Sequence, residues 1–229
     1  MSSENLKQKE FWLSEFANSY MNRNSNIDYV NNNYKEKTGL TEEEVFIEFF
    51  SDLDKDLKIL EVGCNVGVKI SMLQKMGFTN LTGLELNKNA YEIAKKNYPD
   101  IEFINSDIEE YETDKKYDLV YTCGVLIHLN PAIISNVVKK IFSLSKIYIF
   151  GFESYSEKLQ EVRYRENLHV QWKQDFLGVY MKNFPELEIL KQKKITYLND
   201  EKAFTKEVGE EDYTEKNESL QDIAYLLKK

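Results

Sequence analysis

The sequence has only two cysteines and no long apolar run, and both absences narrow the class of protein. Cys64 and Cys123 lie far apart and in no metal-type pair, so the sequence suggests neither a disulfide framework nor a metal site. No apolar run approaches the ~18 residues of a membrane-spanning helix. The first ten residues, MSSENLKQKE, are too polar for a signal peptide. We therefore expect a cytoplasmic protein with no membrane partner.

Basic charge is also scarce. The chain has 39 Asp and Glu residues against 30 Lys and Arg, for a net charge of −9. Proteins that bind nucleic acids carry basic stripes, so this balance argues against a nucleic-acid partner and indicates a solvated acidic surface. Only Arg23, Arg163 and Arg165 are arginines. They either mark sites that need a planar guanidinium or reflect codon usage, and the sequence leaves both open.

The central part of the chain alternates between predicted strands and helices. Thr41 and Glu44 form a capping box, and Asn130 with Pro131 predicts another helix start. Strands are predicted at residues 59–62, 81–86, 101–104, 117–122 and 146–152, with helices between them. Such alternation is typical of an α/β, doubly wound, mostly parallel sheet, in which ligands bind beyond the carboxyl ends of the strands. The residues at those ends are Gly63, Glu85, Asp107, Cys123 and Glu153.

The segments on either side of this alternating region have less regular sequence patterns. Trp12, Phe16 and Tyr20 recur at helical spacing and predict an amphipathic helix over residues 8–24, followed by an asparagine-rich loop over 24–38. Residues 170–184 are predicted as a helix. Residues 188–198 and 219–227 are predicted as strands, and the acidic stretch 199–218 between them as a long loop.

The stretch from Gly63 to Gly67 predicts a nucleotide-binding turn between a strand and a helix. Gly63 can adopt a positive φ and leaves the backbone open to a ligand. Glu85 follows 22 residues later and could accept both hydroxyls of a ribose, or be an ordinary surface glutamate. Asp107 could accept a hydrogen bond from an adenine amino group, or simply close a turn.

Glu61 distinguishes between the nucleotide ligands that this turn could bind. A carboxylate two residues before Gly63 would repel a pyrophosphate but would suit the ammonium group of a methionine moiety, which points to S-adenosyl-L-methionine (SAM). The motifs ILEVGCNVG, GLELN, NSD and YDLVYTCGVLIHLNP, in this order, resemble the class I SAM-dependent methyltransferases over Leu57–Glu153. The resemblance implies a Rossmann-like seven-stranded sheet with an antiparallel C-terminal strand and an N-terminal helical cap. It implies a single domain over 1–229, with the cap at 1–40 and an acceptor-side insertion at 154–185.

The same resemblance implies roles for individual residues. The methionine pocket is shaped by Glu61, Gly63 and Gly67; Glu85, followed by Leu86, holds the ribose; Asp107 and Ile108 frame the adenine. Asn65 stands where a glycine is usual, so it either adopts a left-handed conformation or uses its amide as a contact. We expect Cys64 and Cys123 to line the cofactor floor without a catalytic role, because nothing nearby favours a thiolate.

A narrower set of motifs is similar to the methylases associated with pseudaminic acid and related sugar biosynthesis. The motifs are FWLSEF and Y-x-x-RN near the start, GVLIHLNP, and a late R-Y-R followed by W-K-Q-D-F. By this resemblance Tyr20 and Arg23 bind SAM. The acceptor side would include Tyr155, Arg163, Arg165, Trp172 and Lys173. The expected reaction is methyl transfer to an amino or hydroxyl group of a small, anionic or nucleotide-linked sugar.

Methyl transfer from SAM needs alignment of the acceptor, and a base only where the acceptor must lose a proton. His128 is the first candidate base, although it could instead brace the helix start at Asn130. Glu153 and Tyr155 are second choices. Arg163, Arg165, His169 and Lys173 form either an anion-binding cluster or ordinary surface charge.

Two other functions stay open at this point. A nicotinamide-dependent oxidoreductase would use a similar fold, but Glu61 argues against a pyrophosphate. A SAM-binding subunit without catalytic activity would be consistent with Asn65 and with Gln174, which stands where the sugar-methylase pattern has a basic residue.

Overall fold

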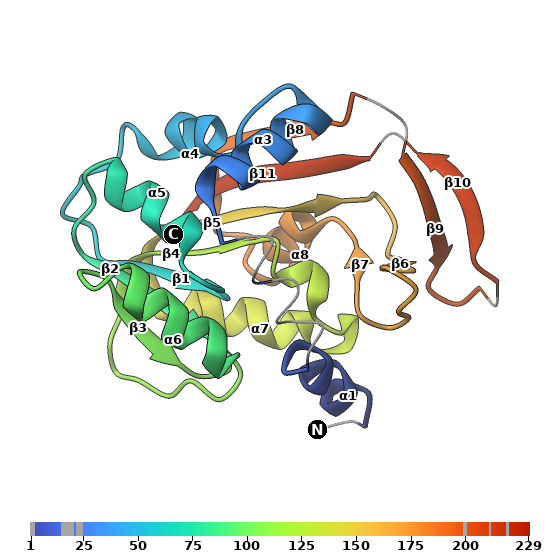
Figure 1. Ribbon diagram of the computed structural model, residues 1–229, viewed down its shortest axis with the longest axis horizontal. Helices are drawn as coiled ribbons and strands as arrows, with labels where there is room; N and C mark the ends of the chain where they lie inside the picture. Colours follow the sequence, from blue (N-terminus) through green and yellow to red (C-terminus); the bar gives the residue numbers. More distant parts are fainter. Residues whose placement is uncertain (1–2, 15–20, 22–24, 199–200, 211, 219) are drawn as a thin grey trace.

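The computed structural model describes residues 3–14, 21, 25–198, 201–210, 212–218 and 220–229. Its centre is a seven-stranded sheet with the order β3-β2-β1-β4-β5-β11-β8 (Figure 1). β11 runs antiparallel to both of its neighbours, whereas β1 to β5 pair in parallel. This confirms the predicted sheet and its antiparallel C-terminal strand. The strands are β1 (Ile59–Val62), β2 (Leu81–Glu85), β3 (Glu102–Asn105), β4 (Tyr117–Cys123), β5 (Ser145–Tyr155), β8 (Glu188–Thr196) and β11 (Gln221–Lys228).

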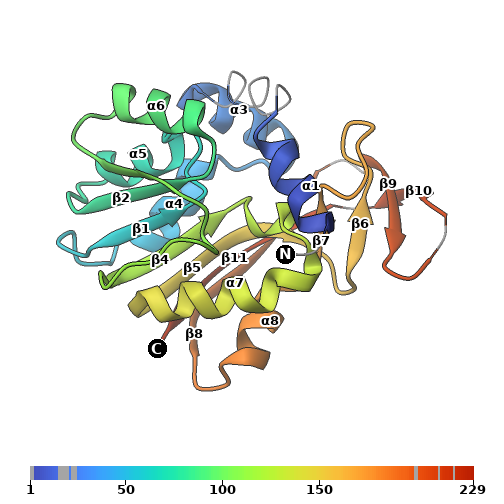
Figure 2. The same cartoon turned by 90° about the horizontal axis from the view of Figure 1, so that it is seen from below.

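Helices cover both faces of this sheet (Figure 2). One face packs against α3 (Ile27–Thr38), α4 (Glu42–Phe50), α5 (Val68–Lys75) and α6 (Lys88–Asn97), and the other against α7 (Pro131–Leu144) and α8 (Phe176–Asn183). Successive strand residues therefore enter different cores: Ile59 packs with the first group of helices and Leu60 with the second. Among the described residues, no helix combines the length and apolar character that a bilayer crossing requires.

Two predicted helix starts have the expected caps. The Thr41 hydroxyl accepts the Glu44 N–H at 3.0 Å, and the Glu44 carboxylate accepts the Thr41 N–H at 2.7 Å. Asn130 accepts the Ala132 N–H at 2.9 Å, with Pro131 at the first helical position. These local signals were readable because each cap involves residues only two or three positions apart.

The predicted N-terminal elements were wrong in part. The first helix is α1 (Ser3–Trp12) and does not continue over 8–24 as one helix, because Ser14 donates its hydroxyl to the Phe11 carbonyl at the helix end. Residues 24–38 are not a loop, since most of them form α3. Asn26 caps this helix by accepting the Asp28 N–H at 2.7 Å. Tyr20 and Arg23 lie outside the described residues.

The C-terminal half contains a second sheet that the sequence analysis missed. β6 (Gln160–Val162), β7 (Trp172–Lys173), β9 (Glu201–Glu207) and β10 (Thr214–Glu218) form it in the order β10-β9-β6-β7. The predicted loop over 199–218 is therefore wrong. The predicted helix over 170–184 is also wrong in its first part, since β7 pairs with β6 and α8 begins only at Phe176, after the cap Asp175.

Candidate active site

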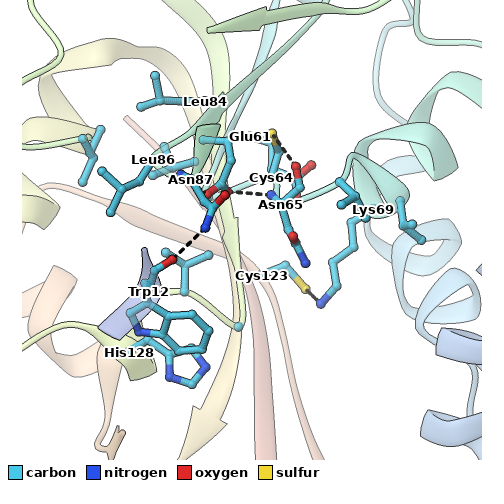
Figure 3. Close-up of a pocket in the computed structure, with 18 of the residues that line it drawn as sticks. Trp12, Glu61, Cys64, Asn65, Lys69, Leu84, Leu86, Asn87, Cys123 and His128 are labelled. Carbon is cyan, nitrogen blue, oxygen red and sulfur yellow. Dashed lines mark hydrogen bonds between the residues drawn. The ribbon is translucent and has the colours of Figure 1, made fainter. Parts of the chain in front are cut away.

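A cavity of about 230 Å³ opens at the carboxyl ends of β1, β2 and β4 (Figure 3). This is the edge of the sheet at which the sequence predicts a ligand. The cavity brings together predicted residues from four separate segments of the chain. They are Glu61, Gly63, Cys64, Asn65, Glu85, Leu86, Asp107, Ile108, Cys123 and His128.

The glycine turn has the backbone that its sequence predicts. Gly63 has a φ of 70°, and a Cβ added there would lie 2.7 Å from a methyl group of Val125. Asn65 has a φ of 49°, so it adopts the left-handed conformation, the first of the two options for this residue. Gly67, with a φ of 84°, lies at the start of α5 and does not itself line the cavity. The turn therefore directs the N-terminus of α5 beside the cavity.

Glu61 is the most unusual charge in the site. It is only 1% exposed, and its Oε2 atom is buried without a hydrogen-bond partner among the described residues. Burial raises the pKa of Glu61 to about 7, opposed in part by the neighbouring Tyr121 hydroxyl and by the charge of Lys69. Glu61 also lines the cavity, and a buried carboxylate in such a wall is suited to a ligand that brings its own N–H donors or positive charge.

Glu85 is held in a fixed orientation at the end of β2. One carboxylate oxygen accepts the Asn65 N–H at 2.8 Å, and the other accepts the Asn87 N–H at 2.7 Å. Burial raises the pKa of this carboxyl group, and these backbone hydrogen bonds oppose the effect. Each oxygen keeps a lone pair for a ligand hydroxyl. Leu86 and Ile108 add apolar surface to the same cavity.

Asp107 already has partners on both oxygens. Its Oδ1 accepts the Glu109 N–H at 2.9 Å, and its Oδ2 forms an ion pair with Lys9 of α1. This ion pair and the one with Glu109 raise the pKa of Lys9 against the effect of its burial. A hydrogen bond from Asp107 to a ligand would therefore share the carboxylate with Lys9.

Both cysteines are neutral thiols. Burial raises the pKa of Cys64 and of Cys123 well above the ordinary value. The Lys69 ammonium donates to the Cys123 sulfur at 3.0 Å, as the dashed line in Figure 3 marks, and pairs with Glu42 at 3.1 Å. A thiol that stays protonated is a poor nucleophile, and the lack of a catalytic role for either cysteine stays a prediction.

A second cavity of about 300 Å³ adjoins the first. The two share Glu42, Lys69, Cys123, Gly124 and His128 in their walls. The rest of the second wall comes from α3, from the end of β5, from β11 and from the segments around Tyr164 and Tyr197. A ligand in the first cavity could therefore meet a second molecule at the shared wall.

His128 lies in this shared wall. Its Nδ1 atom is 3.1 Å from the Val170 carbonyl, which can only accept, so Nδ1 carries the proton and Nε2 keeps a free lone pair. The centre of its ring lies 4.3 Å from the centre of the Trp12 ring. Figure 3 shows the two labelled side chains next to each other. Burial lowers the pKa of His128 to about 4, so the ring is neutral at pH 7.

Glu153 lines the second cavity and supports the segment that carries His128. Its carboxylate accepts the Val125 N–H at 3.2 Å, and the His128 N–H bonds back to the Val125 carbonyl at 2.9 Å. This segment contains the short 3-10 helix η1 (Leu126–His128). Burial raises the pKa of Glu153 to about 7. Glu153 thus both positions His128 and has a pKa suited to proton transfer.

Most residues predicted for the acceptor side lie elsewhere. Arg165 lines the second cavity, but the other four line neither cavity. Trp172 and Lys173 are buried in β7. The predicted basic cluster is also partly neutralised, because Arg163 pairs with Glu166 and the His169 ring contacts Glu161 at 2.7 Å. Tyr155 packs under the Lys194 ammonium at 3.8 Å.

The sequence analysis missed the polar wall of the second cavity. Asp222 of β11 accepts hydrogen bonds from Tyr34 of α3 at 3.1 Å and from Tyr197 at 3.2 Å. Tyr34 and Asp222 are 188 positions apart, and no local motif links residues at that separation. The missed polar lining residues include Tyr29, Tyr34, Glu42, Lys69, Tyr197 and Asp222.

Comparison with known proteins agrees with this geometry. Residues 59–147 match the protein family described as "Methyltransferase domain". The ubiquinone biosynthesis O-methyltransferase of Rickettsia conorii is 37% identical over 101 residues, which are 42% of this chain and 35% of that protein. The corresponding protein of Rickettsia bellii strain OSU 85-389 is 37% identical over 92 residues, 38% of each chain. The chain thus spans little more than a third of these relatives.

Solved structures extend the likeness to the whole fold. Magnesium protoporphyrin IX methyltransferase from Synechocystis PCC 6803, with bound SAM, has a TM-score of 0.66 at 12% identity. The match covers 100% of this chain and 98% of that one. The 1,6-didemethyltoxoflavin-N1-methyltransferase of Burkholderia thailandensis has a TM-score of 0.58 at 10% identity, over 82% and 76% of the chains. The chain therefore has the Rossmann-like fold of these methyltransferases, and residues 59–147 are the part that matches the family model.

Proposed function

We propose that this chain is a SAM-dependent methyltransferase that holds SAM in the first cavity and a small acceptor molecule in the second. The observation that carries the proposal is the pairing of Glu61 and Glu85 across one cavity, each a buried or half-buried carboxylate at a strand end. Glu61 suits the ammonium of the methionine moiety, and Glu85 suits the ribose hydroxyls. Leu86 and Ile108 supply apolar surface for the adenine ring.

In such a reaction the acceptor atom attacks the methyl carbon of the sulfonium in line with the breaking bond. The new bond to carbon forms, the carbon–sulfur bond breaks, and S-adenosylhomocysteine (SAH) leaves as a neutral thioether. A hydroxyl acceptor also loses a proton. His128 could take it on Nε2, and Glu153 is the other candidate because it lines the same cavity. The chain's main contribution is alignment and exclusion of water.

The acceptor class is proposed from the second cavity. Its wall contains four tyrosines, two amides and several charged groups, which suits a polar molecule with hydroxyl or amino groups better than an apolar one. This supports the amino or hydroxyl group of a small sugar derivative as acceptor. The Rickettsia relatives bear names from ubiquinone biosynthesis, so a phenolic hydroxyl is the second candidate.

The two rival functions make different predictions for ligands. An oxidoreductase would be stabilised by NAD, whereas Glu61 favours SAM. A thermal-shift comparison should show a rise in Tm with SAH and none with NAD. A rise with NAD and none with SAH would contradict the proposal. Transfer of radiolabelled methyl groups to a panel of amino sugars, sugar phosphates and catechols would then separate an enzyme from a SAM-binding subunit without activity.

A further inference from the structure

One wall of the second cavity is built around a buried carboxylate. Asp222 is 7% exposed and lines the second cavity only. Its Oδ2 accepts the hydroxyls of Tyr34 at 3.1 Å and Tyr197 at 3.2 Å, and its Oδ1 accepts the Ser154 hydroxyl at 2.8 Å. Tyr34 lies in α3, Ser154 in β5 and Asp222 in β11, and Tyr197 directly follows β8. Only the folded chain brings these four residues together.

These hydrogen bonds determine what the wall offers to a ligand. A hydroxyl has one hydrogen and two lone pairs, so a hydroxyl that donates to Asp222 can present only lone pairs to the cavity. Burial and the charge of Asp222 raise the pKa of Tyr34, which keeps its hydroxyl protonated and donating. The wall of Tyr34, Ser154, Tyr197 and Asp222 therefore consists of hydrogen-bond acceptors, and we call it the acceptor-atom wall.

We infer that the acceptor-atom wall binds a second amino or hydroxyl group of the methyl-accepting molecule, distinct from the group that is methylated. The reacting group has to lie where the cavities meet, beside Cys123, Gly124 and His128. The residues of the acceptor-atom wall line the second cavity and not the first. The inferred substrate class is therefore a small amino alcohol or polyol. This inference rests on the proposed function.

The same cavity contains positive charges that would favour a different ligand group. Lys37 lines this cavity with its ammonium 5.8 Å from the centre of the Tyr197 ring, and Arg165 lines it too. These groups would bind a phosphate or carboxylate. A ligand that carries both a phosphate and an amine can therefore show which feature the acceptor-atom wall selects.

The test compares two probes that differ in one donor group: glucosamine 6-phosphate and 2-deoxyglucose 6-phosphate. Calorimetry with the full chain, with and without saturating SAH, gives both affinities. We expect at least about tenfold tighter binding of the amine, because a charge-assisted hydrogen bond is worth roughly 1.5–3 kcal/mol. The preference should fall below about threefold in Tyr197→Phe, which removes only a hydroxyl, and in Asp222→Asn.

Tyr91→Phe is the matched control, since Tyr91 lies on α6 outside both cavities, and its preference should equal that of the parent. Equal affinity of the parent for the two probes, binding of neither, or an unchanged preference in Tyr197→Phe would overturn the inference. Circular dichroism checks the fold of Asp222→Asn. Failure of the parent to bind SAH would instead overturn the proposed function, and the probe preference measured without SAH would still report on the wall.

Discussion

The carboxylate of Glu85 accepts the backbone N–H of Asn65 at 2.8 Å, which ties the end of β2 to the middle of the glycine turn. Asn65 occupies the left-handed region with a φ of 49°, and this hydrogen bond helps to hold it there. The group expected to bind the ribose therefore also shapes the turn expected to bind the methionine moiety. A substitution at Glu85 acts on both ends of the cofactor site.

Glu85→Ala should weaken SAH binding by at least about a hundredfold. It removes two hydrogen bonds to a ligand and leaves the N–H groups of Asn65 and Asn87 without their partner, and each loss is worth about 1–3 kcal/mol. Isothermal titration calorimetry measures the Kd. Glu92→Ala, on the exposed side of α6, removes a carboxylate outside the cavity and serves as the control. An unchanged Kd in Glu85→Ala would refute the ribose assignment.

Binding of SAH at pH 7 should release protons from Glu61. The pKa of this buried carboxyl is raised to about 7 from 4.5, so near pH 7 the empty protein holds a proton there in about half of the molecules. The ligand ammonium favours the charged carboxylate and expels that proton. Titrations at pH 7.0 in phosphate and in Tris, whose ionisation enthalpies differ, should give different apparent binding enthalpies.

Glu61→Gln should abolish this buffer dependence, whereas Glu153→Gln should retain it because Glu153 lines only the second cavity. The raised pKa of Glu61 also makes the stability of the fold depend on pH. A raised folded pKa means that the folded state binds the extra proton between pH 4.5 and 7, so the contribution of Glu61 to stability is lost as pH rises through that window. Identical enthalpies in both buffers would contradict the ammonium assignment.

His128→Ala should lower turnover about a hundredfold while changing the Kd for SAH less than threefold, as expected for the loss of a general base. The pKa of His128 is lowered to about 4, so a reaction that depends on its neutral form should be independent of pH above about 6. A pH–rate profile of the parent tests this. A limb near pH 7 that disappears in Glu153→Gln would assign the base to Glu153 instead, whose pKa is about 7.

Gly63→Ala should destabilise the protein by about 2–4 kcal/mol. The new Cβ would lie 2.7 Å from Val125, and the residue would keep a positive φ of 70°, so overpacking adds to backbone strain. Gly77→Ala is the matched control, because its φ is also positive, at 94°, while no atom of the described residues lies within 4 Å of the added Cβ. Its cost should be about 1 kcal/mol. Equal losses in urea unfolding would mean that the contact with Val125 does not matter.

The sequence predicts the central sheet well because its signals are local. Strand ends, the Thr41 capping box and the glycine turn each involve neighbouring residues, and all appear at the expected positions. The residues of the first cavity follow from those strand ends. Their spacing along the chain is set by the alternation of strands and helices, so a reader of the sequence can place Glu61, Glu85 and Asp107 near one another.

The elements outside the central sheet depend on tertiary contacts, and the sequence predicts them less well for that reason. The asparagines of residues 24–38 suggest a loop, but the segment forms a helix with Val30, Asn31, Tyr34 and Thr38 buried. Burial of Asn31 is possible because its amide donates to the Glu43 carboxylate at 3.1 Å. β9 pairs with β10 and with β6, and its contact with β6 joins residues more than 40 positions apart. The second cavity could not be predicted because its wall brings α3 together with the end of β5 and with β11, which are far apart in the sequence.

Helix α1 is attached to the candidate site at several separate points. Gln8 donates to the His128 carbonyl and accepts the Asn130 N–H at 2.8 Å, Asn87 donates to the Trp12 carbonyl at 2.9 Å, and Lys9 pairs with Asp107. Each of these partners lies in or beside the first cavity. Docking of this helix and occupancy of the cavity are therefore linked equilibria, and the linkage is reciprocal. The factor by which a bound ligand raises the equilibrium constant for docking of the helix equals the factor by which the docked helix raises the ligand's affinity.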